Sequence, residues 1–128
     1  MSASVDIEAA LFGILKRFDR IGFGRRGVLD AERDLQHFAA ALAAEDRARV
    51  FQVIVSWIDG GEAARVTATL HYNLPEHLQA LAIRLCASLP IPETLPLLRR
   101  LQAEGAFATD HERICREALR ESLARLRA

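Results

Sequence analysis

The sequence predicts an all-α domain of about seven helices in antiparallel pairs. Apolar residues recur at helical spacing along most of the chain, and glycine or proline interrupts them at short intervals. Of the 128 residues, 51% are hydrophobic and 27% are charged, a composition that supports a buried core and argues against disorder. Because no long linker divides the chain, we expect residues 1–128 to form a single helical domain.

Two helices separated by a glycine-rich loop are predicted in the N-terminal part. The first covers residues 4–20, where apolar side chains lie three or four positions apart and acids occupy the first turn. Residues 22–27 form the loop, which contains Arg25 and Arg26 among three glycines. The second helix covers residues 28–44, and its alanine-rich end strongly favours helix.

The middle of the chain leaves two interpretations open. Residues 46–59, with Asp46 as the cap, form a helix that is apolar nearly all round. Gly60 and Gly61 are expected to end this helix, and a weaker helix follows over 62–73. The β-branched and alternating residues of 50–72 also fit a β-hairpin. We favour the helices, because a lone two-stranded hairpin would lack sheet partners.

Three further segments complete the chain. A helix is predicted over residues 75–89, and the next begins where Pro92 and Pro96 fall at or near its first turn. Thr109 and Glu112 have the spacing of a capping box, so the last helix begins there and runs to the end of the chain.

Residues 76–102 combine an Ala/Leu-rich helix, a short proline-containing turn and a second helix with the sequence Leu-Pro-Leu-Leu. In this form the stretch resembles one HEAT-type repeat. Weak internal repetition accompanies it, because Val50, Ile54 and Ile58 share their spacing with Leu81, Leu85 and Leu89 and with Cys115, Leu119 and Leu123. The resemblance implies a short solenoid or an irregular bundle that binds other proteins, and it supplies no active-site residues.

Charge and cysteine content narrow the classes of function. Lys and Arg number 17, and Asp and Glu also number 17, whereas a dedicated nucleic-acid binder usually carries a basic excess. No apolar run reaches membrane-spanning length, and residues 1–6 lack the features of a secretory signal. Cys86 and Cys115 belong to no paired motif and are expected to be buried reduced thiols. These observations predict a cytoplasmic protein without a membrane partner.

No motif for catalysis, metal binding or cofactor binding is recognisable. Ser56 and Ser88 have no neighbouring base. The four histidines have no established metal-ligand spacing; they are His37, His71, His77 and His111. We therefore expect neither an enzyme nor a bound cofactor.

Charged residues in three regions are the candidates for contact with a partner. The arginines of the 22–27 loop could hold a phosphate or an acidic loop, although a solvated turn that ends the first helix is the simpler interpretation. Acids follow on the next helix, and further arginines lie on helices expected to line a concave face. The candidates are Arg25, Arg26, Asp30, Glu32, Asp34, Arg65, Arg99 and Arg100.

Non-enzymatic protein binding is the function that these observations predict. Its most concrete form is an immunity protein that occludes the active site of a toxin, with the acids of the 28–44 helix and Glu45-Asp46 facing a basic site. A scaffold or regulatory subunit of a larger assembly is the alternative. A third hypothesis, nucleic-acid binding through the arginine pairs 25–26 and 99–100, predicts strongly salt-dependent affinity.

Overall fold

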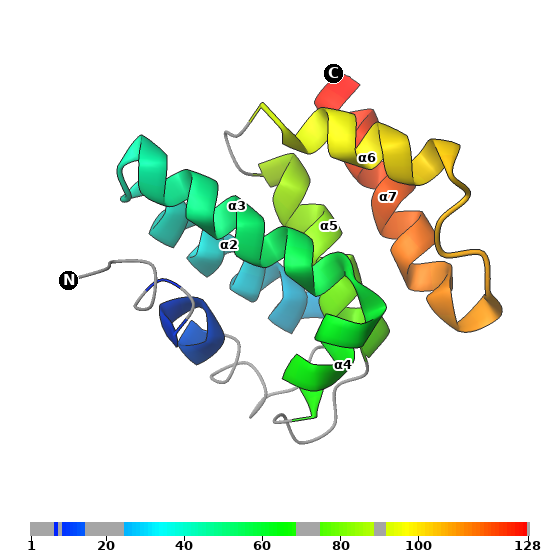
Figure 1. Ribbon diagram of the computed structural model, residues 1–128, viewed down its shortest axis with the longest axis horizontal. Coiled ribbons are helices and arrows are strands. Elements are labelled where there is room, and N and C mark those ends of the chain that lie inside the picture. Colours follow the sequence, from blue (N-terminus) through cyan, green and yellow to red (C-terminus); the bar gives the residue numbers. More distant parts are fainter. Residues whose placement is uncertain (1–6, 8, 15–24, 69–74, 89–91, 128) are drawn as a thin grey trace.

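The computed structural model describes residues 7, 9–14, 25–68, 75–88 and 92–127. Within these ranges the regular structure is helical and contains no strand, which confirms the all-α prediction. Residues 7 and 9–14 are helical. The labelled elements in Figure 1 are α2 (Arg25–Ala40), α3 (Ala44–Ile58), α4 (Gly60–Thr67), α5 (Pro75–Ser88), α6 (Thr94–Ala103), the 3₁₀ turn η1 (Asp110–Glu112) and α7 (Arg113–Arg127).

The β-hairpin alternative for residues 50–72 is not supported. Residues 50–58 belong to α3 and residues 60–67 to α4, while 69–74 lie outside the described residues. The β-branched side chains of α3 are accommodated in a helix because the helix is packed along its length, and such packing overrides a modest local preference.

Gly60 and Gly61 begin α4, so the prediction that they end the preceding helix is wrong. Asp59 has extended backbone angles (φ −67°, ψ 125°) and joins the two helices. Its carboxylate accepts a hydrogen bond from the Gly61 N–H at 3.0 Å. An aspartate in this conformation is a strong N-cap, and glycine is tolerated in a first turn when such a cap is present.

Two other helix boundaries differ from the predicted ones. The helix predicted at 28–44 covers Arg25–Ala40, so residues 25–27 are helical rather than part of a loop. Ala43, with extended angles, precedes α3 and is its N-cap in place of Asp46. Asp46 lies within the first turn together with Glu45, where the positive end of the helix dipole still favours an acid.

Helix α5 is the centre of the molecule. It packs against α2, α3, α4, α6 and α7, and Figure 1 shows it between the α2–α3 pair and the α6–α7 pair. Leu78, Leu81 and Leu85 form one stripe, Ile83 points to another side of the helix, and all four are fully buried. A helix with buried apolar residues on more than one side needs neighbours on each of those sides, and this requirement accounts for the bundle around α5.

The most extensive helix contact joins α5 and α7, which run in the same direction. The Cys115 thiol donates to the Glu76 carbonyl at 3.4 Å, and the Ser122 hydroxyl donates to the Ile83 carbonyl at 3.4 Å. Both bonds join residues 39 positions apart, and a constant separation is possible only for parallel helices. Helix α6, which connects them in the chain, runs in the opposite direction and packs against both α5 and α7 (Figure 1).

The end of α3 is attached to α5 by one buried side chain. Gln79 is 5% exposed, and its Nε2 donates to the Ile58 carbonyl at 2.7 Å. This bond satisfies a carbonyl that has no intrahelical partner at the end of α3. The attachment fixes one wall of the surface feature described below.

Candidate partner-binding groove

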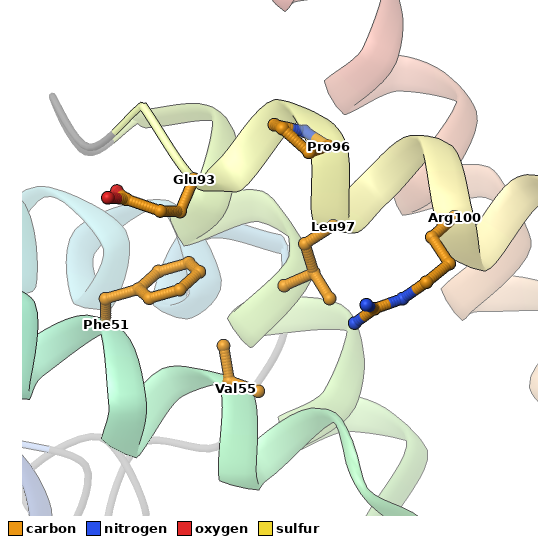
Figure 2. A pocket seen from close by; sticks show the side chains of 6 residues that line it. All are labelled: Phe51, Val55, Glu93, Pro96, Leu97 and Arg100. Atoms are coloured by element: carbon orange, nitrogen blue, oxygen red, sulfur yellow. The ribbon is translucent and has the colours of Figure 1, made fainter.

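A hollow of about 260 Å³ opens between α3 and α6. We name it the α3–α6 groove. Figure 2 shows its lining side chains, which are Phe51, Val55, Glu93, Pro96, Leu97 and Arg100. Apolar side chains occupy the middle of the groove, and Glu93 and Arg100 lie toward its two ends along α6.

The α3 wall is a second apolar strip on a helix that already has one. Val50, Ile54 and Trp57 are buried in the core, whereas Phe51 and Val55 are only partly buried and line the groove. Phe51 and Val55 are four positions apart and therefore lie on the same side of the helix, one turn from each other. The second strip accounts for the apolar character that α3 has nearly all round.

The α6 wall is one complete helix face. Its residues at 93, 96, 97 and 100 have the i, i+3, i+4, i+7 spacing of a single stripe. The other side of α6 carries Thr94 and Leu98, which are buried against the core. Pro96 lies in the first turn, where the missing N–H is not needed.

Neither charged end of the groove has an ion-pair partner within the described part of the chain. Glu93 is the N-cap residue of α6 but makes no capping hydrogen bond with its side chain. Several other described charges are paired: Arg33 with Asp30 at 2.7 Å, Arg113 with Glu117 at 3.1 Å, and Arg84 with Glu121 at 3.5 Å. The carboxylate of Glu93 and the guanidinium of Arg100 thus remain available to a partner.

Of the candidate residues predicted from the sequence, Arg100 is the one that lines the groove. Arg99 is exposed on the same helix but points away from the groove lining. Arg65 lies on α4 and forms an ion pair with Glu62. Helix α4 packs against α3 and α5, whereas α6 packs against α5 and α7, and Figure 1 shows α4 and α6 in different parts of the bundle.

The candidates on α2 do not form one acidic row. Arg25 and Arg26 begin the helix, and their side chains lie outside the described residues. Asp30 pairs with Arg33 at 2.7 Å, and Asp34, four positions further on, lies on the same side of the helix. The other predicted acid, Glu32, faces inward.

Glu32 joins α2 to α7. It is 8% exposed, and its carboxylate accepts from Arg125 Nη1 at 3.4 Å. A carboxylate this deeply buried is positioned to hold two helices together rather than to meet a partner.

Five lining residues of the groove were not among the predicted candidates: Phe51, Val55, Glu93, Pro96 and Leu97. One signal in the sequence pointed to them. Val55 lies off the main stripe of its helix, so the sequence indicated a second apolar surface on that helix. It did not indicate that α6 would lie opposite this surface. Bringing α3 near α6 requires tertiary packing through α5, which periodicity alone does not encode.

The described cysteines are buried and unpaired. Burial raises the pKa of the Cys86 thiol to about 12. Burial, and then the neighbouring charges of Glu112 and Glu76, raise the pKa of Cys115 to about 12. Both are therefore protonated and poor nucleophiles near neutral pH.

The described ranges contain neither a metal-ion site nor a membrane-spanning helix. No group of three His, Cys, Asp or Glu side chains there is arranged to hold a metal ion. No described helix is both long enough and apolar enough to span a bilayer.

Comparison with known proteins gave no relative of this chain. No family model matches it, and neither the curated proteins nor the solved structures contain a match. The resemblance of residues 76–102 to a HEAT repeat therefore stays a prediction, and the groove must be interpreted from its own geometry.

Proposed function

We propose that this chain is a non-enzymatic protein-binding module whose contact surface is the α3–α6 groove. The observation that carries the proposal is an accessible apolar strip made by Phe51, Val55 and Leu97, with an unpaired acid and an unpaired base at its ends. Protein interfaces commonly have such an organisation, in which apolar anchors are surrounded by polar groups that fix orientation.

The shape of the groove favours an apolar helical segment as its occupant. Its walls are two helices, and helical walls bind amphipathic partners that insert side chains at every third or fourth position. Phe51 offers a large apolar surface with few rotatable bonds, so little side-chain entropy is lost when a partner covers it. Glu93 and Arg100 then select the direction in which the segment lies.

An immunity protein remains the most specific form of the proposal, with a scaffold subunit as the alternative. Two facts bear on the immunity form. The acids on α2 offer less free charge than the sequence indicated, because Asp30 and Glu32 have internal partners. Glu45 and Asp46 keep an acidic corner at the start of α3, which suits the basic active site of a nuclease toxin.

Co-expression with the products of neighbouring genes tests the proposal. A partner that co-purifies with the wild-type chain should bind roughly tenfold or more weakly to Leu97→Asp, because this change buries an acid in the centre of the contact. The matched control is Ile114→Asp, which changes an apolar residue that is 38% exposed on α7 and lies outside the groove. Circular dichroism should show that both variants remain folded.

The same pair of variants separates the two forms of the proposal. An immunity protein restores the growth of cells that express the toxin, and Leu97→Asp should abolish this protection while Ile114→Asp retains it. A scaffold subunit should show the Leu97-dependent loss of binding without any effect on growth. Equal partner binding by wild type and Leu97→Asp would contradict the groove as the contact surface.

A further inference from the structure

The charges at the ends of the α3–α6 groove are arranged so that the groove can face a copy of itself. Glu93 and Arg100 are seven positions apart on α6, which corresponds to roughly two helical turns and keeps both on one face. Pro96 and Leu97 lie midway between them. When two such faces meet with their helices antiparallel, each Glu93 lies opposite the Arg100 of the other copy.

We infer that the occupant of the groove is a second copy of this chain, bound in a two-fold symmetric dimer with α6 antiparallel to α6. This inference rests on the proposed function, since it names the partner of the same groove. Symmetry of this kind makes one patch serve both sides of the interface, so each favourable contact occurs twice. The two-fold axis passes beside Pro96 and Leu97, where the surfaces are apolar.

Three features of the chain support self-pairing over a partner of unrelated sequence. The two end charges have opposite sign and equal distance from the centre of the stripe, which is the condition for self-complementarity. Neither charge has an ion-pair partner elsewhere in the described ranges. The chain carries 17 basic and 17 acidic side chains, so no net repulsion separates two copies.

Pairing of the apolar strips supplies the attraction, and the charges set the direction. Phe51, Val55 and Leu97 are partly exposed in the single chain, so covering them removes apolar surface from water. A parallel arrangement of the two helices would place Glu93 against Glu93 and Arg100 against Arg100. The antiparallel arrangement is favoured because it replaces both repulsions with attractions.

Charge reversal combined with mixing gives the decisive experiment. Glu93→Arg leaves two positive ends on the groove, and Arg100→Glu leaves two negative ends. Each variant alone should dimerise roughly tenfold or more weakly than the wild type, because like charges then face each other across the interface. An equimolar mixture of the two variants should dimerise again, because every positive end now meets a negative one.

Sedimentation equilibrium across micromolar to millimolar concentrations measures these species. The matched control is a mixture of Arg99→Glu and Glu104→Arg, which changes the net charges by the same amounts at exposed positions on α6 and at its C-cap, outside the groove lining. Each control variant alone should dimerise as the wild type does. Circular dichroism of every variant checks that α6 and the rest of the bundle remain helical.

A wild-type chain that stays monomeric over the whole concentration range would overturn the inference. So would a dimer that is insensitive to both groove charges, or control variants that lose and regain dimerisation as the groove variants do. A different protein whose binding is weakened by Leu97→Asp would still support the groove as a contact surface, so self-pairing can fail while the proposed function stands.

Discussion

Burial decides the role of Glu32, which its sequence pattern does not reveal. Together with Asp30 and Asp34 it forms an alternating acidic run, and such a run suggests a charged surface. A helix turns by about 100° per residue, so the middle acid of the run points away from the other two. In the fold that direction leads to Arg125 on α7, and the residue becomes an internal link between helices distant in sequence.

Removal of Arg125 and removal of Arg33 should therefore have unequal effects on stability. Arg125→Ala is expected to lower the free energy of unfolding by about 1 kcal/mol, since it takes a charged partner from the buried carboxylate of Glu32. Arg33→Ala should cost less than about 0.5 kcal/mol, because Asp30 is 36% exposed and water replaces the lost partner. Urea denaturation of both variants measures the difference, and equal costs would show that Glu32 does not depend on Arg125.

The two buried thiols predict how stability depends on alkaline pH. Burial raises the pKa of Cys86 and Cys115 from 9.0 to about 12. Between these values the unfolded chain releases protons that the folded chain keeps, so the free energy of unfolding should fall as the pH rises from 9.0. The Cys86→Ala/Cys115→Ala variant should lose this dependence. Urea midpoints below and within the window test it, and parallel pH profiles for both chains would contradict it.

At the scale of elements, the helices followed from the sequence better than their ends did. Apolar periodicity predicted most of the described helices, because a buried stripe is a property of many residues at once. The helix that begins at Gly60 was instead predicted because a lone hairpin would lack sheet partners. The Asp59-Gly60-Gly61 boundary depends on the conformation of one residue. Glycine after a helix usually indicates the end of that helix. Here the extended backbone of Asp59 shows that Gly60 and Gly61 begin the next helix.

The groove was less predictable than the helices that form it. Arg100 was identified from its charge, and the other indication was that the helix predicted over residues 46–59 is apolar nearly all round. Phe51 and Leu97 look like ordinary core positions in the sequence, and they remain partly exposed because α3 and α6 are held apart on the surface of α5. Such a separation results from the packing of five helices around one, which local patterns do not specify.

The start of α7 combines a predicted feature with a testable dependence on pH. The backbone N–H of Thr109 donates to Glu112 Oε1 at 3.3 Å, and its hydroxyl donates to the same oxygen at 2.5 Å. These bonds, the hydroxyl bond most strongly, lower the pKa of Glu112 from its usual 4.5. The charged carboxylate therefore stabilises the folded state when the pH is above the usual pKa of 4.5. This stabilisation is lost as the pH falls through the lowered pKa of the folded chain.

Thr109→Ala should remove much of this contribution. We expect a loss of about 1 kcal/mol in the free energy of unfolding near neutral pH, which is typical of a removed helix cap. The difference from the wild type should shrink in acid, where Glu112 is protonated in both chains. Thr109→Ser keeps the hydroxyl and should follow the wild-type profile. An Ala variant whose deficit is constant with pH would show that the hydroxyl acts independently of Glu112.

At the scale of the whole molecule, stability is centred on α5. Every other labelled α-helix packs against it, so none of them can bury its apolar face if α5 is absent. Helix α6 lies at the periphery, where only Thr94 and Leu98 are buried. This difference also suits the groove, because the wall that meets a partner is the one that can adjust at least cost to the core.

Hydrogen exchange should reveal this hierarchy. Amides in α5 are expected to exchange only through global unfolding, whereas those of α6 should exchange through local opening at a lower free energy. Leu85→Ala, which opens a cavity at a fully buried position, should cost about 2–5 kcal/mol and accelerate exchange in α5 and in its neighbours together. Leu101→Ala, at a partly buried position on α6, should accelerate exchange chiefly within that helix. Mass spectrometry of the wild-type chain measures the exchange. If amides in α6 exchange as slowly as those in α5, the bundle opens as one unit, and the α6 wall of the groove is as rigid as the core.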